Sequence, residues 1–178
     1  MSVADGIGAN TRIRRAEPSD AAALTALALR SKAFWGYDAA FMAACRAELT
    51  VAAADVRAHP TFVLEAAGRT LGFYQLRRDG TAAEVRLFFV APEAVRGGIG
   101  RRLWTHLEET ARALGALRLE VDSDPHAGGF YCAMGMRRAG QVHSGSIAGR
   151  TLPHLVKDFA VPVADQPPAA RDGQEVRR

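Results

Sequence analysis

The feature that most constrains this chain is a strand that runs through a glycine-rich turn into an amphipathic helix. The strand-like segment 83–90 is followed by Pro92 and by the turn 95–101, which contains three glycines. A helix then extends to about Leu114, because apolar residues recur at helical spacing. Its buried face consists of Ile99, Leu103, Leu107, Ala111 and Leu114. Since another strand follows at 117–121, we expect a βαβ crossover that joins two parallel neighbours in one sheet.

Strands and helices alternate along the rest of the chain, so we predict a mixed α/β fold. Turn residues such as Asp79 and Gly80 between apolar segments indicate an antiparallel meander ahead of the glycine-rich turn. The central sheet should be mostly antiparallel, with about six to seven strands flanked by about four helices. The expected strands are 12–16, 62–66, 71–77, 83–90, 117–121, 137–143 and 155–159. The expected helices begin near Pro18, Asp38, Ile99 and Pro125, the second with Phe41, Cys45 and Leu49 on one face.

Residues 11–161 are expected to form a single domain. The chain has 178 residues, enough for one hydrophobic core, and 48% hydrophobic with 24% charged residues is the balance of a folded protein. The small and polar residues 1–10 predict a flexible N-terminus. The segment 162–178 is rich in Pro, Ala, Asp, Gln and Arg, which predicts a disordered C-terminal tail.

Composition disfavours several classes of protein. No apolar run reaches the ~18 residues of a membrane span, and the N-terminus lacks a signal-peptide core, so we expect a cytoplasmic protein that does not enter a membrane. Cys45 and Cys132 lie far apart without metal-ligand spacing, so we expect two buried thiols and no metal. The net charge of +4 comes from arginines spread over the whole chain, which argues against a nucleic-acid partner.

The glycine-rich turn has the form of an anion site. The first N–H groups of a helix have no intrahelical partner, and the positive end of the helix dipole points at a ligand bound there. Glycines let the backbone approach a phosphate, and Arg96 and Arg101 can add charge-assisted hydrogen bonds. The alternative is a tight strand-to-helix connection without a ligand. The turn is neither a dinucleotide fingerprint, which needs an acidic residue about 20 positions on, nor a P-loop, which needs Gly-Lys-Ser/Thr.

Two motifs together resemble the GNAT superfamily of N-acetyltransferases. Phe-Phe-Val-Ala-Pro-Glu at 88–93, followed by Gly-Ile-Gly-Arg-Arg-Leu at 98–103, looks like the central motif of that family. Asp-Pro-His-Ala at 124–127, followed by Phe-Tyr and Met-Gly-Met up to Met136, looks like its second motif. The resemblance covers roughly residues 12–161 in element order. It implies a GNAT-type fold, with acetyl-CoA as co-substrate and without a metal.

The resemblance also implies where acetyl-CoA would bind, in the splay between the central strand and the next parallel strand. Backbone groups of 88–90 would face the pantetheine arm and the acetyl carbonyl, and the turn would face the pyrophosphate. The turn departs from the family pattern at Val95, where Gln or Arg is usual, and at Arg96, where Gly is common. Asp124 matches a position that contacts the cofactor arm, and it can equally be a helix N-cap. The implied cofactor residues are Phe88, Phe89, Val90, Val95, Arg96, Gly97, Gly98, Ile99, Gly100, Arg101 and Asp124.

Two residues match catalytic positions of the family, in which an amine attacks the acyl thioester directly. Tyr131 matches a general acid whose hydroxyl lies near the sulfur, and the alternative is a core aromatic residue beside Phe130. Glu84 matches the general base of several relatives, and the alternative is a solvated carboxylate or a partner of Arg86. His126 begins a short helix, where a polar residue is ordinary.

The implied activity is transfer of an acetyl group from acetyl-CoA to a primary amine, on an acceptor that the sequence does not identify. Trp35 and Tyr37 lie in the loop where this family varies its acceptor pocket, so they form an aromatic wall, a cation–π contact or part of the core. The loop 144–149 can close the other side of that pocket. The alternative function is a GNAT-shaped sensor that binds acyl-CoA without turnover. Pairing of the C-terminal strands between subunits would give a homodimer.

Overall fold

The computed structural model describes residues 11–159, which form the predicted mixed α/β fold. The expected flexible N-terminus at 1–10, the expected disordered tail at 162–178 and the expected domain end at residue 161 lie outside the described residues. Within the described range, the order of strands and helices follows the order expected from the sequence, with local differences given below.

One seven-stranded sheet runs through the molecule, in the order β1-β2-β3-β4-β5-β7-β6. Every pair of neighbours is antiparallel except β4 and β5, which are parallel and are joined by the helix that follows the glycine-rich turn. The predicted βαβ crossover is therefore confirmed. The strands are β1 Thr11–Arg15, β2 Thr61–Ala66, β3 Arg69–Asp79, β4 Ala82–Val90, β5 Arg118–Asp122, β6 Arg137–His143 and β7 Thr151–Asp158.

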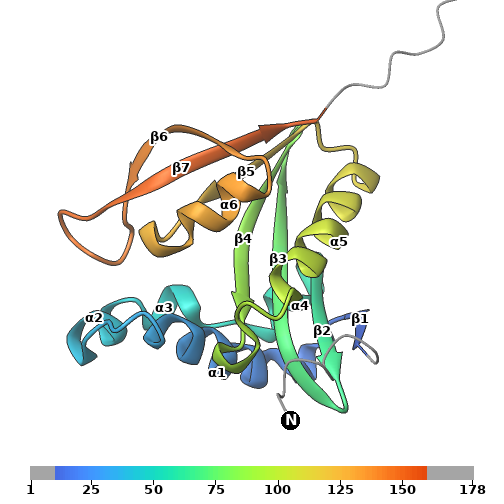
Figure 1. The fold of residues 1–178 in the computed structure, drawn as a ribbon, viewed down its shortest axis with the longest axis horizontal. Helices are drawn as coiled ribbons and strands as arrows, with labels where there is room; N and C mark the ends of the chain where they lie inside the picture. The colour runs from blue at the N-terminus through green and yellow to red at the C-terminus, as the bar shows by residue number, and fades with distance from the viewer. Residues whose placement is uncertain (1–10, 160–178) are drawn as a thin grey trace, which may run out of the picture.

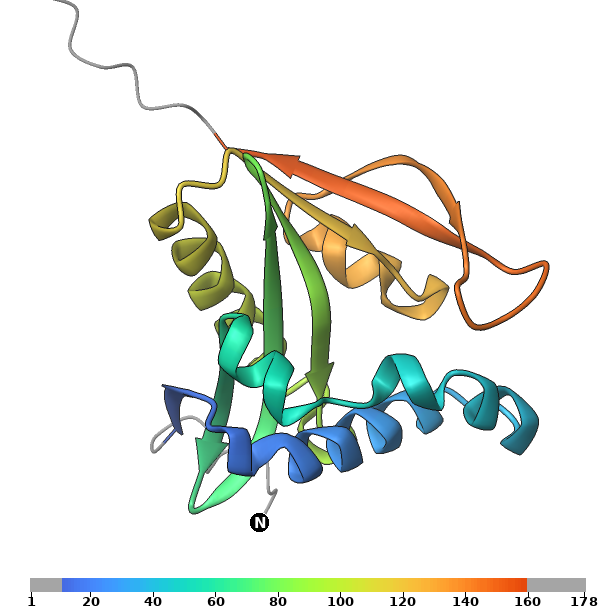
Figure 2. The same cartoon turned by 180° about the vertical axis from the view of Figure 1, so that it is seen from behind.

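Helices cover both faces of the sheet, as Figures 1 and 2 show from opposite sides. α1 and α4 lie on one face, whereas α5 and α6 lie on the other; α2 and α3 continue the layer of α1. The helices are α1 Ala21–Ala33, α2 Ala39–Ala44, α3 Arg46–Leu49, α4 Ala53–Ala58, α5 Ile99–Ala113 and α6 Gly128–Ala133. Three short 3-10 helices are η2 Pro18–Asp20, η3 Pro92–Ala94 and η4 Pro125–Ala127.

The position of α5 is fixed by close packing against β3. Tyr74 of β3 is buried, and its hydroxyl forms hydrogen bonds with His106 (2.8 Å) and Thr110 (2.9 Å) of α5. Gly72, two residues earlier on the same face, lets the helix approach. A Cβ at this position would lie 2.8 Å from Leu103 Cδ1 and 2.8 Å from the carbonyl oxygen of Phe89. The N-terminus of α5 is thereby held beside the end of β4.

The described residues contain six α-helices instead of about four, because two local expectations fail. The helix expected from Asp38 is interrupted at Cys45, whose φ of −88° and ψ of 2° are not helical, so α2 and α3 are separate. In addition, α4 is short and rich in Ala, so its apolar periodicity does not predict it. Phe41 and Leu49, expected on one helix face, consequently lie in different helices.

Two further expectations need correction. Cys45 is buried as expected, but Cys132 is exposed, because α6 turns the preceding Tyr131 toward the core and the next residue points outward. β7 begins at Thr151, four residues before the expected start. Pro153 has no N–H to donate but stays within the strand, where its carbonyl accepts a hydrogen bond of 2.8 Å from the Ser123 N–H.

The two parallel strands β4 and β5 pair only at one end. Residues Ala82–Glu84 of β4 pair with Arg118–Glu120 of β5, and beyond these residues the strands diverge (Figure 1). The pairing of β4 with β3 skips Arg86, because Val85 and Leu87 oppose consecutive residues of β3. Such a bulge bends its strand. The bulge therefore lies where β4 turns away from β5, and the fold opens there.

Candidate active site

A cavity of about 480 Å³ lies where β4 and β5 diverge. Four parts of the chain line it: β4 with the glycine-rich turn, the end of β5 with α6, the layer of α1 to α3, and the loop between β6 and β7. We call the place where β4 and β5 diverge the fork. A smaller cavity of about 220 Å³ is lined by Glu84 and Glu120, the last paired residues before the fork opens. Val121 and Asp122 line both cavities.

The edge of β4 supplies unpaired backbone groups to the large cavity. The Ala91 N–H donates a hydrogen bond of 2.8 Å to the carbonyl of Leu71 in β3. Since alternate residues of an antiparallel pair bond to opposite sides, the backbone groups of Phe88 and Val90 point toward β5. β5 does not pair with this part of β4. These groups are consequently available to an extended ligand, as a sheet edge is to an added strand.

The glycine-rich turn presents a row of unpaired N–H groups. Among the described residues, no backbone acceptor is found for the N–H groups of five turn residues. They are Arg96, Gly98, Ile99, Gly100 and Arg101. The first intrahelical bond of α5 is donated by Arg102 to the carbonyl of Gly98, at 3.1 Å. Successive free N–H groups at the positive end of a 15-residue helix form an anion-binding concavity.

The shape of this turn depends on two left-handed residues. Gly98 has φ 79°, which glycine adopts without strain, and Arg96 has φ 68°, which is unfavourable for a residue with a Cβ. In the GNAT pattern this position is commonly Gly. Because Arg96 has a Cβ, the departure from that pattern also introduces backbone strain into the turn.

The structure brings most of the predicted cofactor residues to one cavity. Its lining residues include Phe88, Phe89, Val90, Val95, Arg96, Gly100 and Asp124. Ile99 is buried in the core, so only its N–H can face a ligand. Gly97, Gly98 and Arg101 are exposed and do not line the cavity. The backbone N–H groups of Gly98 and Arg101 have no acceptor within the described chain and are therefore available to bind an anion outside the cavity.

Tyr131 of α6 lies in the wall of the same cavity. Its ring is 5% exposed and packs edge-on against Phe88 of β4, with ring centroids 6.2 Å apart. No hydrogen-bond partner of its hydroxyl is found within residues 11–159, yet that hydroxyl is not sealed away from the cavity. Burial raises the pKa of Tyr131, and the negative charge of Asp124 raises it further. The phenol is therefore held in its protonated form, as a proton donor requires.

Glu84 is not brought into the large cavity. Its carboxylate lies 2.6 Å from the Arg77 guanidinium of the neighbouring strand and lines the smaller cavity at the closed end of the fork. The alternative pairing with Arg86 is also absent, since Arg86 contacts Asp55 of α4 at 3.3 Å.

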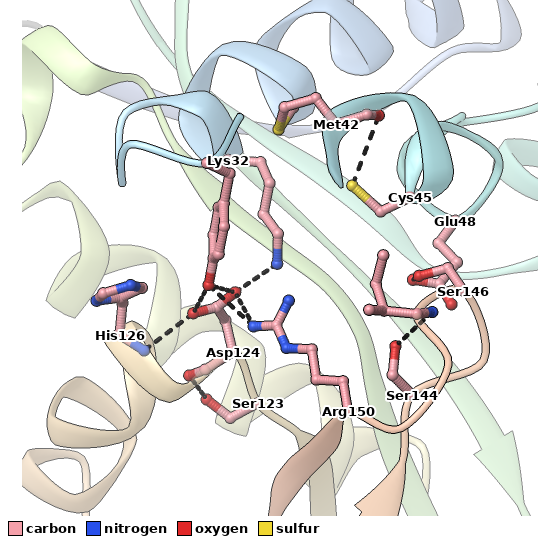
Figure 3. A network of polar contacts seen from close by, with 12 residues as sticks. Lys32, Met42, Cys45, Glu48, Ser123, Asp124, His126, Ser144, Ser146 and Arg150 are labelled. Carbon is pink, nitrogen blue, oxygen red and sulfur yellow. Dashed lines mark hydrogen bonds and ion pairs between the residues drawn. The ribbon is translucent and has the colours of Figure 1, made fainter. Parts of the chain in front are cut away.

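The carboxylate of Asp124 is the centre of a polar cluster, shown in Figure 3. It caps η4 by accepting the His126 N–H at 2.9 Å, which confirms the N-cap interpretation. It also accepts hydrogen bonds from Lys32, from the Tyr37 hydroxyl at 2.9 Å and from Arg150 at 3.2 Å. Burial raises the pKa of this carboxyl, but the hydrogen bonds from Lys32 and from the His126 N–H together outweigh that effect. The net shift of the Asp124 pKa is therefore downward. Asp124 is accordingly a carboxylate.

The cluster explains the positions of the predicted acceptor residues. Tyr37 does not line the cavity, and its ring contacts two cations of the protein itself, Lys32 at 5.1 Å and Arg150 at 5.2 Å. Trp35 is 42% exposed, lines the cavity, and stacks on the ring of His126 at 5.1 Å. Trp35 therefore belongs to the cavity wall, while the cation–π contacts of Tyr37 are made to cations of the protein itself.

Sequence reasoning did not single out Lys32 and Arg150. They lie 118 positions apart and carry no local motif, and only the fold brings them to one carboxylate. The loop expected to close the pocket does reach the opposite helices, because the Ser146 hydroxyl donates to Glu48 of α3 at 2.8 Å. The large cavity is thus enclosed between that loop and the layer of α1 to α3.

Residues 11–159 were searched for metal-ligand clusters and for membrane-spanning helices. No group of three or more His, Cys, Asp or Glu side chains is placed to hold a metal ion. No helix in this range has the length and apolar character of a membrane-spanning segment.

The chain is similar to known acetyltransferases in fold. A GCN5-related N-acetyltransferase from Rhodopseudomonas palustris superposes with a TM-score of 0.70 at 23% identity, over 85% of this chain and 97% of the other. The PaiA N-acetyltransferase of Thermoplasma acidophilum, solved with coenzyme A, gives 0.68 at 17% identity, over 84% and 99%. YncA of Salmonella typhimurium, solved with acetyl-CoA, gives 0.62 at 19% identity, over 89% and 99%. No curated protein matches the chain significantly.

Sequence similarity identifies the family. The model of the acetyltransferase (GNAT) domain matches residues 31–145, more than half of the chain. This match includes β4, the glycine-rich turn, α5, β5 and α6, which are the elements that build the large cavity. The chain therefore belongs to the GNAT acetyltransferase family.

Proposed function

We propose that this protein transfers an acetyl group from acetyl-CoA to the primary amine of an acceptor, by direct attack within a ternary complex. One observation carries the proposal: a single cavity is lined by the edge of β4, by Tyr131, and by Arg96 and Gly100 of the turn, whose N–H groups are unpaired in the described chain. An anion site, a strand edge and a proton donor are what a thioester of CoA needs along its length.

The binding of acetyl-CoA uses the backbone more than side chains. The N–H groups of 98–101 and the helix dipole of α5 receive the pyrophosphate. Arg96, at the mouth of the cavity, adds a guanidinium. The strand-like edge at Phe88 and Val90 pairs with the amides of the pantetheine arm. The Val95 N–H is already donated to the Pro92 carbonyl at 3.3 Å, so this mode of binding does not use Val95, and its departure from the family's Gln or Arg leaves the binding intact.

The chemical step needs an oriented amine, a stabilised carbonyl and a proton for the departing thiolate. An N–H group on the edge of β4 donates to the thioester carbonyl oxygen as negative charge develops there. Tyr131 gives its proton to the sulfur as the carbon–sulfur bond breaks. The nitrogen loses a proton as it bonds to the acetyl carbon, and Glu84 receives this proton through water along Val121 and Asp122, which line both cavities.

The second candidate is a sensor that binds acyl-CoA without turnover, and the departures at Val95 and Arg96 are what favour it. The two functions separate in one assay. Release of free CoA thiol is measured with acetyl-CoA and a panel of primary amines, while both concentrations are varied. Intersecting rate plots support a ternary complex; tight CoA binding with no thiol release across the panel supports the sensor.

The variant Tyr131→Phe tests the acid. Removal of a hydroxyl without a protein partner leaves packing intact, so the variant should fold and bind CoA as the wild type does. We expect kcat to fall by about 10²-fold, the lower range for loss of a general acid. Cys132→Ser, which changes the exposed neighbour of Tyr131 on α6 and lies outside the cavity, is the control. An unchanged kcat in Tyr131→Phe would remove the acid role.

A further inference from the structure

The polar cluster beside the fork holds more positive than negative charge. Lys32 and Arg150 both contact the single carboxylate of Asp124, and all three side chains are mostly buried, with exposed fractions of 15%, 17% and 14%. Tyr37 donates its hydroxyl hydrogen to Asp124 and accepts one from Arg150 at 2.9 Å, so it adds no charge. Two cations and one carboxylate leave one positive charge without a partner inside the cluster.

A second carboxylate on this part of the wall, that of Glu48, does not balance that charge by contact. Glu48 accepts the Ser146 hydroxyl and is exposed, and no cation pairs with it among the residues described. Elsewhere along the cavity, Arg86 is paired with Asp55, and Asp122 forms a hydrogen bond of 2.8 Å with the His154 ring, which carries a compensating charge only when it is protonated. An exposed carboxylate is solvated and screened, whereas a mostly buried cation is costly to leave uncompensated.

Unused donors of the cluster face the cavity. Arg150 uses only Nη2 in its contacts within the described chain, so Nε and Nη1 retain hydrogens without an acceptor. Lys32 has one acceptor for its ammonium group. The two free atoms of Arg150 are not sealed in the interior, since the one fully buried side-chain polar atom without a partner in residues 11–159 is Thr11 Oγ1. Lys32 and Arg150 line the cavity together with Tyr131.

The aromatic rings behind the cations hold them in place without neutralising them. Arg150 lies 4.7 Å from the centre of the Phe41 ring, and Lys32 lies 5.6 Å from it. Contacts of this kind attract a cation through the ring quadrupole and leave its hydrogen-bond donors unused. The pair is consequently ordered before any ligand arrives, which lowers the entropy lost on binding.

We propose that Lys32 and Arg150 bind a carboxylate of the acceptor, so that the substrate is an amino acid or a similar amine that carries a carboxylate. One surplus charge matches the single charge of a carboxylate, and a guanidinium with an ammonium beside it can contact both of its oxygens. The inference rests on the proposed acetyl transfer for its role. Docking of the carboxylate at this cluster orients the amine of the same molecule toward the fork.

The test compares acceptors that differ only in the carboxylate. L-leucine is set against isoamylamine, and L-phenylalanine against phenethylamine, with kcat/KM measured for each. We expect the amino acids to be preferred at least tenfold. Arg150→Met and Lys32→Met should each reduce that preference by roughly 10- to 100-fold, the range for a hydrogen bond to a charged group. Either variant leaves the other cation to neutralise Asp124, so both should fold.

The matched control is Arg57→Met. This residue is exposed on α4, outside the cavity, and has no ion pair within the described chain. It should keep the wild-type preference. Equal kcat/KM for an amino acid and its decarboxylated amine, or an unchanged preference in both cluster variants, would overturn the inference while leaving acetyl transfer in place.

A binding measurement separates this inference from the proposed function. The protein saturated with CoA is titrated with N-acetyl-L-leucine, with N-isoamylacetamide and with inorganic phosphate. Binding of the carboxylate alone, lost in Arg150→Met and Lys32→Met, upholds the carboxylate site even if no acetyl transfer is detected. Equal binding of the amide without a carboxylate, or tighter binding of phosphate, contradicts it.

Discussion

Replacement of Arg96 by Gly should move the stability of the protein and its affinity for CoA in opposite directions. Arg96 has φ 68°, and a left-handed residue with a Cβ costs about 1–2 kcal/mol. Glycine removes this cost, but its greater conformational entropy in the unfolded chain lowers the free energy of unfolding by about 0.5–1 kcal/mol. The free energy of unfolding of Arg96→Gly should therefore equal that of the wild type or exceed it by up to about 1.5 kcal/mol.

The same variant loses a guanidinium at the mouth of the cavity. A hydrogen bond to a charged group contributes about 1.5 kcal/mol at the lower end of its range, which suits an exposed residue. The dissociation constant for CoA should rise roughly tenfold, and less so at high salt because the contact is screened. Arg96→Ala is the matched variant, because it loses the same charge but keeps a Cβ at the left-handed position.

Urea unfolding without ligand and calorimetric titration with CoA are measured on both variants. Equal losses of affinity, with Arg96→Gly more stable than Arg96→Ala by about 1 kcal/mol, would support both parts of the reasoning. Wild-type affinity in both variants would refute a contact between Arg96 and the ligand. A less stable Arg96→Gly would refute the assignment of backbone strain to this turn.

Three further predictions concern the base, the packing of α5 and the tyrosines. Glu84→Gln should lower kcat/KM at neutral pH by about 10²-fold and flatten its rise with pH, and an unaltered pH–rate profile would remove the base role. Gly72→Ala should lower the free energy of unfolding, measured by urea titration, by about 2 kcal/mol, because its Cβ would lie 2.8 Å from a backbone oxygen of β4. The control is Gly129→Ala, where a Cβ would meet no atom within 4 Å, and this variant should be neutral or stabilising in the same titration. Burial raises the pKa of Tyr37, Tyr74 and Tyr131 above the ordinary 10.0, so each holds its proton more tightly when folded. Stability should then be complete below about pH 10 and fall above it, with tyrosinate absorbance appearing only as circular dichroism reports unfolding; tyrosinate in a still folded protein near pH 10 would contradict this.

The part of the site that local sequence determines could be predicted. The turn at 95–101 has glycines where the backbone is left-handed or closely approached, and apolar spacing defines α5 beyond it. Position 96 was a departure in the sequence and is a strained residue in the structure. Tyr131 follows from a short motif whose place in the fold is set by β5 and η4. These features depend on neighbours within a few residues, which a pattern can express.

Features that depend on distant parts of the chain could not be predicted in this way. Lys32 and Arg150 meet Asp124 only after the sheet has formed, and no local pattern marks either of them. Glu84 matches a motif by position, but its carboxylate is turned to Arg77 by the pairing of β3 with β4. Pro153 is the reason that the start of β7 was predicted too late, because proline usually argues against a strand. The missing N–H of proline is unfavourable in a strand only where a neighbouring strand needs that donor.

The measurement that tests the central claim most directly is calorimetric titration of the purified protein with acetyl-CoA, with desulfo-CoA and NAD as comparators. If the turn and the edge of β4 form the CoA site, both CoA species should bind with micromolar affinity and NAD should not bind. Absence of CoA binding would contradict the account, and the turn at 95–101 would then be only a connection between β4 and α5.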